Sequence, residues 1–267
     1  VPAYEVYDPR PVHPVALPVL SMSSTPLLGE GDVANGRVHP DIDHQVVMPR
    51  ELDSPGHVAG DAPVLQLLAH PLCGIIAGGG RASQPLQTAR GNVISDARGN
   101  RQSTLLFPTG TQAELVLPDG STQPLSNLTV RSTEYTVGPN GPQAMPAMLP
   151  PGVEYTYAVE LSADEALTAG AGEIRFNQPV VHYVENFLGF AAGARVPAYI
   201  YDWERGLWVP VEDGRVIRIL GVTAGLADLD TNGDGLADDP ARLTALGISD
   251  TERQQISTLY PTGQMLW

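Results

Sequence analysis

Short apolar runs alternate with turn-forming residues through the middle of the chain. Two such runs are Thr104-Leu-Leu-Phe107 and Ala113-Glu-Leu-Val-Leu117, and the triplet Pro118-Asp-Gly120 follows the second. This triplet predicts a tight turn, because proline fixes φ, aspartate accepts a hydrogen bond within the turn and glycine adopts a positive φ. The repeated pattern predicts short strands between about residues 88 and 220.

A strict alternation of residue types marks the longest of these predicted strands, residues 154–161. Tyr155, Tyr157, Val159 and Leu161 alternate with more polar or smaller residues. Period two places one set of side chains on each face of a strand, so we expect one buried face. Strands at this spacing predict a mostly β chain with β-sandwich architecture.

Helix signals are confined to short segments. Ser162-Ala-Asp-Glu165 fits a capping box and predicts a short helix over 163–169. Near the C-terminal end, Pro240 predicts the start of a helix that runs to about Leu246. Asp250 is the expected cap of a second helix over 251–260, which Pro261 would end.

The chain is predicted to fall into three regions. Residues 1–80 form an extended arm rich in Pro, Gly and His, with a short apolar segment near its end. Residues 81–220 form the sandwich region, in which a Pro-rich stretch at 139–151 is the expected break between two sub-domains. Residues 221–267 hold an Asp-rich loop followed by the short helices.

Charge and composition exclude several classes of function. The formal charge is −15, and all 15 basic residues are Arg. An acidic surface repels phosphate, so we expect neither nucleic-acid binding nor attraction to anionic membranes. No apolar run approaches the ~20 residues that span a bilayer, so membrane insertion is not expected. The single cysteine, Cys73, precludes an internal disulfide, and the start at Val1 suggests a mature or excised fragment.

The strongest chemical signal is a cluster of five Asp within residues 228–239. Calcium takes six to eight oxygen ligands, and a loop with acids at alternate positions can wrap around the ion. Without a cation these carboxylates would repel one another, and the simpler interpretation is a solvated acidic turn.

Two ligand registers fit this loop. The favoured register starts at Asp230 and uses the following donors: Asp230, Asn232, Asp234, the carbonyl of Leu236, and Asp238. Its twelfth position is Ala241, which cannot coordinate, so Asp228 or Asp239 would supply the missing acid. The other register starts at Asp228 and ends at Asp239.

The loop resembles the calcium loops of dockerins and thrombospondin type 3 repeats. Calcium is plentiful outside cells, so the loop favours a secreted or cell-surface location.

Two alternatives to a purely structural role follow from other residues. Tyr201, Trp203 and Trp208 lie close together in the sequence and could stack on sugars, which makes a glycan the alternative partner. A group of residues around His39-Pro-Asp-Ile-Asp43-His44, together with His57, loosely echoes a zinc hydrolase motif. Exposed aromatics on one flat face would favour the first alternative, and converging histidines would favour the second.

Several motifs in order resemble one family of large proteins. They are Arg101-Gln-Ser-Thr-Leu-Leu-Phe-Pro-Thr-Gly-Thr111, Leu117-Pro-Asp-Gly-Ser121, Arg131-Ser-Thr-Glu-Tyr-Thr-Val-Gly-Pro-Asn-Gly141 and Tyr183-Val-Glu-Asn-Phe-Leu-Gly-Phe190. These stretches resemble the segment that precedes the repeat shell in bacterial Rhs/YD-repeat proteins, which are similar to the Tc-toxin shell component and to teneurins. The strand that ends in Leu-Phe-Pro-Thr-Gly-Thr also resembles ZU5-type β-sandwich domains.

The resemblance covers about two-thirds of the chain, from about residue 88 to Trp267. It implies a non-catalytic structural or interaction module of a larger secreted, toxin-associated protein, with the YD-repeat shell or other parts of the same polypeptide as partner. The chain itself contains no YD repeats. The His-Phe-Ser self-cleavage signature of some ZU5 relatives is also missing, so autoproteolysis is not expected.

Overall fold

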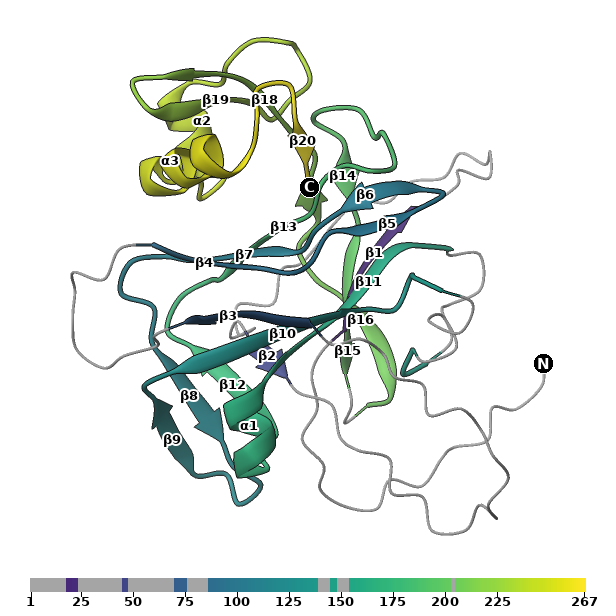
Figure 1. Ribbon diagram of the computed structural model, residues 1–267, viewed down its shortest axis with the longest axis vertical. Helices are drawn as coiled ribbons and strands as arrows, with labels where there is room; N and C mark the ends of the chain where they lie inside the picture. Colours follow the sequence, from purple (N-terminus) through teal and green to yellow (C-terminus); the bar gives the residue numbers. More distant parts are fainter. Residues whose placement is uncertain are drawn as a thin grey trace, which may run out of the picture.

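The chain folds mainly into antiparallel β-sheet (Figure 1). The computed structural model describes residues 18–23, 45–47, 70–75, 86–138, 145–147, 154–202 and 205–267. Within these residues the helices are few and short, which confirms the prediction of a mostly β chain. The sandwich architecture and the three-region division stay predictions.

The largest sheet has six strands in the order β16-β15-β1-β11-β10-β3. Their bounds are Leu207–Pro210 for β16, Ala198–Asp202 for β15, Pro18–Ser23 for β1, Glu154–Ala163 for β11, Leu128–Glu134 for β10 and His70–Ile75 for β3. Every neighbouring pair in this sheet is antiparallel. The order shows that strands from the N-terminal segment are interleaved with strands from the middle of the chain.

Smaller sheets complete the β structure. A four-stranded sheet has the order β2-β12-β8-β9 and a three-stranded sheet the order β13-β7-β4. Their bounds are Gln45–Val47 for β2, Glu173–Phe176 for β12, Ala113–Val116 for β8, Thr122–Leu125 for β9, Val181–Tyr183 for β13, Thr104–Phe107 for β7 and Gln87–Arg90 for β4. Two-stranded pairs join β5 (Ile94–Asp96) to β6 (Gly99–Arg101) and β14 (Arg195–Val196) to β17 (Gly214–Arg215). The predicted Pro118-Asp-Gly120 turn is confirmed, since it joins β8 to β9 with Gly120 at φ +81°.

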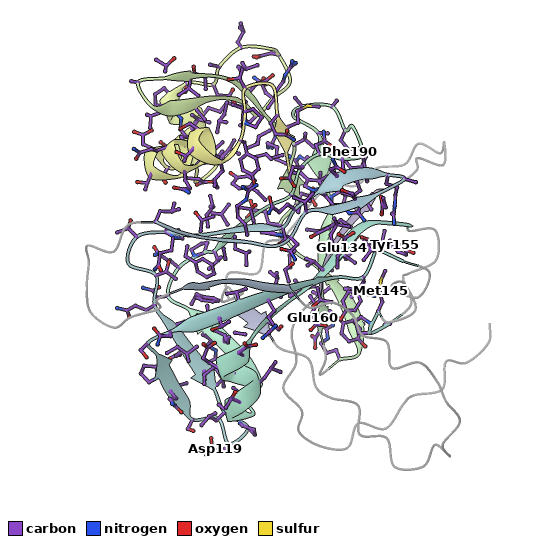
Figure 2. All side chains as sticks on the ribbon, in the orientation of Figure 1. Asp119, Glu134, Met145, Tyr155, Glu160 and Phe190 are labelled. Carbon is purple, nitrogen blue, oxygen red and sulfur yellow. The ribbon has the colours of Figure 1, made fainter. Side chains whose placement is uncertain are left out.

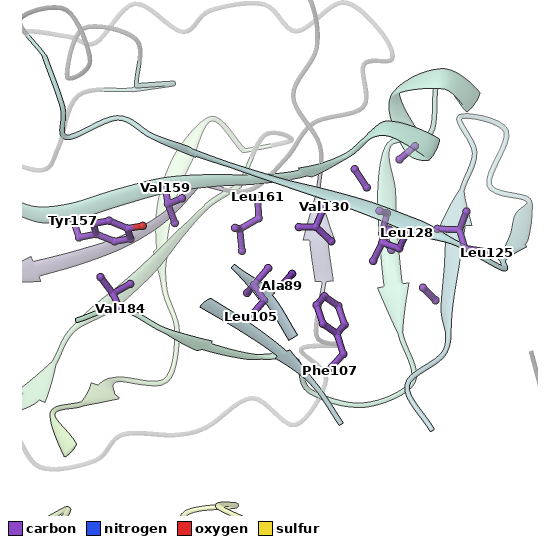
Figure 3. Close-up of a cluster of buried hydrophobic side chains, with 14 of the residues drawn as sticks. Ala89, Leu105, Phe107, Leu125, Leu128, Val130, Tyr157, Val159, Leu161 and Val184 are labelled. Atoms are coloured by element: carbon purple, nitrogen blue, oxygen red, sulfur yellow. The ribbon is translucent and has the colours of Figure 1, made fainter. Parts of the chain in front are cut away.

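Strand β11 is buried on both faces. Figure 3 shows Val159 and Leu161 pointing toward Leu105, which comes from the three-stranded sheet below. On the opposite face, Ala158 packs in a second cluster that includes Trp208. The expectation of one buried face was therefore wrong, because small and polar residues such as Thr156, Ala158 and Ser162 are buried as well. The small residues on the second face are covered as well.

An ion cluster centred on the buried side chain of Arg101 ties the β5–β6 hairpin to β10. The side chain of Arg101 is 1% exposed; its Nε donates to Oε1 of Glu134 at 2.7 Å, and its terminal nitrogens reach the two oxygens of Asp96 at 2.9 and 2.8 Å. The guanidinium also lies 4.6 Å above the ring of Phe187. The hydrogen bond from Arg101 lowers the pKa of Asp96 to about 2, whereas burial raises the pKa of Glu134.

The C-terminal residues form a hairpin backed by two helices. Strands β18 (Ile217–Thr223) and β19 (Leu226–Asp230) pair, and α2 (Pro240–Ala245) and α3 (Asp250–Leu259) follow. Their apolar side chains share one cluster: Ile217, Ile219, Ala227, Leu229, Leu243 and Ile256. The predicted helices are confirmed, with Pro240 at the first position of α2.

Two predicted helix caps were wrong. The cap of α3 is Ser249, which forms a reciprocal capping box with Glu252; Asp250 lies one residue inside the helix. Helix α1 (Asp164–Ala169) occurs where expected, but its cap position is Ala163, which offers no side-chain acceptor. Ser162 is instead the penultimate residue of β11, because pairing with β10 extends that strand beyond the predicted end.

Several contacts hold the C-terminal unit to the rest of the chain. Strand β20 (Met265–Leu266) pairs with β18, and Trp267 exchanges two backbone hydrogen bonds of 3.0 Å with Val184. The hydroxyl of Tyr183, which ends β13, donates to the buried carboxylate of Glu252 at 2.6 Å. The last residues are therefore part of the packed structure.

Removal of the buried guanidinium tests the ion cluster. We expect R101M to lower the free energy of unfolding by about 3–5 kcal/mol, because Glu134 would keep a buried charge without its partner. The control is R131M, which breaks the part-exposed pair of Arg131 with Asp164 and should cost at most about 1 kcal/mol. Urea unfolding measures both variants, and equal losses would contradict the assigned role of Arg101.

A pH titration of stability tests the link through Glu252. Burial raises the pKa of Glu252 above its unfolded value, so the ionised carboxylate opposes folding at high pH and this penalty disappears as pH falls through the folded pKa. We expect E252Q to be more stable than the wild type at pH 8, with the difference shrinking toward pH ~4.5. The measurement is the thermal midpoint at each pH. E212Q, at an exposed position, is the control and should track the wild type throughout.

Candidate calcium site

The Asp-rich loop begins at the end of a strand and finishes at the start of a helix. Asp230 is the last residue of β19, and Asp239 is the cap of α2. The backbone N–H of Asp238 donates to the carbonyl of Leu229 at 2.8 Å, which closes the loop at its base. The sequence does not predict strand β19, because Leu226-Ala-Asp-Leu-Asp230 has acids at alternate positions, a pattern that also fits the calcium loop.

The carboxylate of Asp230 organises the loop backbone. The residue is 1% exposed, and Oδ1 accepts from the N–H groups of Asn232 at 3.1 Å and Gly233 at 2.6 Å. Oδ2 accepts from the N–H of Gly235 at 3.0 Å. Each carboxylate oxygen has two lone pairs, so Oδ2, which accepts one of these bonds, can still accept another partner. A buried acid at the first position thus sets the loop conformation.

Asn232 and Asp234 repeat a local turn at two-residue spacing. Oδ1 of Asn232 accepts from the N–H of Asp234 at 2.9 Å, and Oδ1 of Asp234 accepts from the N–H of Leu236 at 2.8 Å. Their side chains also meet, with Nδ2 of Asn232 donating to Asp234 at 2.8 Å. The Leu236 N–H and the Asn232 amide lower the pKa of Asp234, so its carboxylate is ionised at neutral pH.

Asp238 is the last of the predicted calcium ligands in the favoured register. Its side chain is buried; Oδ2 accepts from the N–H of Thr231 at 2.7 Å, and Oδ1 lies 3.1 Å from Nε of Arg242. Leu236, whose carbonyl is the other expected ligand, is 70% exposed. Arg242 therefore holds one predicted carboxylate donor in an ion pair.

The two acids considered as substitutes serve other partners. Asp228 accepts from the hydroxyl of Thr223 at 2.7 Å and lies 3.9 Å from a terminal nitrogen of Arg253. The carboxylate of Asp239 accepts from the N–H of Arg242 at 2.8 Å as the cap of α2. The hydrogen bonds thus connect Asp230, Asn232, Asp234 and Asp238 within one loop and direct Asp228 and Asp239 elsewhere.

A close backbone approach fixes this loop to the preceding structure. A Cβ placed on Gly193 would overlap the backbone of Asn232, and one placed on Gly233 would overlap the carbonyl of Ala192. Both glycines also have φ near +81°. The guanidinium of Arg215 donates to the carbonyl of Thr231 at 3.3 Å across the same contact. Sequence analysis missed this contact, because nothing in the residues around 193 indicates which segment they meet.

Among the described residues, no group of three or more His, Cys, Asp or Glu side chains converges as a ready metal site. The carboxylates of the loop instead accept backbone N–H groups. The residues expected for a zinc site, His39, Asp43, His44 and His57, lie outside the described part of the chain.

The aromatic residues expected to bind a glycan are buried where they are described. Tyr201 and Trp208 lie on adjacent strands, and their rings pack edge to face with centroids 5.2 Å apart. They belong to the apolar cluster behind β11 and form no exposed platform. Trp203 lies outside the described residues.

One serine–histidine pair occurs elsewhere in the interior. Oγ of Ser103 lies 2.9 Å from Nε2 of His182, and Ser103 is 6% exposed. Burial lowers the pKa of His182 to about 4, so the ring is neutral at neutral pH and shares one hydrogen bond with the hydroxyl. The ring also packs near Tyr157, with centroids 6.3 Å apart. This pair joins β13 to the residues before β7 as a buried hydrogen bond.

Alanine at the two loop glycines tests the backbone approach. G233A introduces both an unfavourable positive φ and a clash with Ala192, whereas Gly235 has nearly the same φ and open space around it. We expect G235A to cost about 1–2 kcal/mol of unfolding free energy. We expect G233A to cost about 1–3 kcal/mol more, because a well-packed contact is overfilled. Urea unfolding of the two variants, compared with each other, measures the clash alone; equal costs would show that the segments are not in contact.

No family model matches the chain, and neither the curated proteins nor the solved structures include a significant match. No helix in the described residues is both long and apolar enough to cross a membrane.

Proposed function

We propose that the chain is a non-catalytic structural module of a larger secreted or cell-surface protein, and that calcium bound by the loop from Asp230 to Asp238 stabilises it. The observation that carries the proposal is the buried carboxylate of Asp230, which accepts three backbone N–H groups of its own loop. This arrangement brings the Asn232 and Asp234 side chains onto the same short loop.

The chemistry of the donors fits calcium. Asp230, Asp234 and Asp238 supply carboxylates, Asn232 an amide oxygen and Leu236 a carbonyl, and calcium prefers such hard oxygen ligands. The register that begins at Asp230 is favoured because Asp228 and Asp239 are engaged by Thr223 and by the start of α2. Binding would need Asp238 to exchange part of its interaction with Arg242 for the cation. Bound calcium supplies positive charge among the clustered carboxylates.

The location of the loop explains how such an ion would act on stability. The loop joins the β18–β19 hairpin to α2, and its backbone contacts the turn before β14 at Gly193. An ion that holds the loop would therefore stiffen the junction between the C-terminal unit and the sheets. A structural role also agrees with the burial of Ser103 and His182 and of Tyr201 and Trp208.

The proposal also includes a β-sandwich architecture and a partner within a larger assembly. The face of β10 and β11 packs on the sheet that holds β4 and β7, as Figure 3 shows, which supports a sandwich-like domain. The resemblance to Rhs/YD-repeat and ZU5-type proteins suggests that the partner is a repeat shell or another part of the same polypeptide. No residue is assigned a catalytic role.

Calcium titration tests the site. Calcium at 100 times its dissociation constant should add about 2.7 kcal/mol to the unfolding free energy, which raises the thermal midpoint. We expect D230N to abolish this rise, because it removes the charge at the centre of the loop. D119N is the matched control, since Asp119 makes a similar local turn with Ser121.

The position of the control residue makes this comparison informative. Asp119 lies at the tip of the β8–β9 hairpin, at the opposite end of the molecule from the β18–β19 hairpin (Figures 1 and 2). D119N should keep the full calcium response. A wild-type midpoint that ignores calcium, or an equal loss of response in both variants, would contradict a calcium site in the loop.

A further inference from the structure

Strand β1 occupies an unusual place in the largest sheet. It comes from the N-terminal segment, yet it lies between β11 and β15, two strands of the middle of the chain. It is antiparallel to both, with Leu20 opposite Ala158 on one side and opposite Tyr199 on the other. The β15–β16 hairpin therefore joins this sheet through β1.

Removal of β1 would leave two facing strand edges. Neighbouring strands lie about 4.8 Å apart, so β11 and β15 are separated by about twice that distance across β1. Each edge would expose backbone N–H and C=O groups, which are a template for pairing with another extended strand. Such a slot binds one strand by backbone hydrogen bonds on both of its sides, as in donor-strand complementation.

The length of the chain connection permits β1 to pair in either of two ways. Residues 24–44, 21 in number, separate β1 from β2, and β2 belongs to a different sheet. A segment of that length can span up to about 70 Å. The connection can therefore reach the slot of its own chain or that of a neighbouring molecule.

We propose that β1 is an exchangeable donor strand, and that the slot between β11 and β15 also accepts the same strand from a second copy of this chain. A second copy is the occupant that fits, because its strand carries the same sequence and therefore the same register, including the irregularity between Ser21 and Met22. The hydrogen bonds within the slot are the same in both forms, and exchange of an identical element is a low-cost route to a dimer.

Engineered disulfides test the proposal on the full-length chain. In a C73S background, L20C/A158C places cysteines opposite each other between β1 and β11, and L20C/Y199C does so between β1 and β15. The matched control is L20C/V159C, because adjacent residues of a strand point to opposite faces and cannot be bridged. Each variant is unfolded in urea, refolded at several chain concentrations and oxidised.

The readout separates exchange from random cross-linking. Chains with natural nitrogen are mixed with ¹⁵N-labelled chains before refolding. Mass spectrometry then identifies linked peptides that join the β1 peptide of one copy to the β11 or β15 peptide of the other. We expect linked monomer at low concentration, and an about tenfold higher ratio of linked dimer to monomer for each tenfold rise in concentration. The control should give neither product.

Two outcomes would overturn the proposal. If neither pair cross-links while both variants retain the wild-type circular dichroism spectrum, β1 does not occupy the slot. If both pairs cross-link only within one chain at every concentration, the strand is fixed in its own molecule and exchange does not occur. The second pair also guards against a folding defect caused by cysteine at the buried Ala158.

Discussion

Strand β11 must be hydrogen-bonded along both edges while its two faces are covered by different apolar clusters. Strand β10 satisfies one edge and β1 the other, so a segment far away in the sequence completes the centre of the largest sheet. The cluster around Val159 faces the sheet of β4 and β7. The cluster around Ala158 includes Tyr201 and Trp208 from the β15–β16 hairpin, which extends the same sheet beyond β1. Strand β11 thus contributes side chains to both apolar clusters and fixes where each of them lies.

Charges in the interior follow the same requirement for partners. Arg101 joins Asp96 and Glu134, and Tyr183 donates to Glu252. Figure 2 shows Glu134 and Glu160 on the central strands, well away from the loop at the C-terminal end. Glu134 and Glu252 are buried and Glu160 is partly buried, and each accepts from a specific donor, which for Glu160 is the hydroxyl of Tyr135. Such pairs fix how neighbouring elements meet and leave little room for alternative registers. In the Asp230 loop the donors to the buried carboxylate are backbone N–H groups instead of side chains.

Local features were predictable from the sequence, and long-range ones were not. The turn at Pro118-Asp-Gly120 and the helix beginning at Pro240 follow from residues with strong backbone preferences. The choice of Ser249 over Asp250 as cap depended on the reciprocal bond with Glu252. The candidate donors of the loop followed from their spacing, but the engagement of Asp228 by Thr223 depends on a strand that its acidic sequence concealed. The pairing of β1 with two strands has no local signal.

The approach of Gly193 to Gly233 constrains how this sequence can diverge. The two positions are forty residues apart, and each leaves room for the backbone of the residue before the other glycine only while it lacks a side chain. Neither glycine can therefore be replaced by a larger residue while the other segment keeps its position. Homologous chains should either retain both glycines or have remodelled both segments together, so the pair would mark descent from this arrangement even where the surrounding residues have changed.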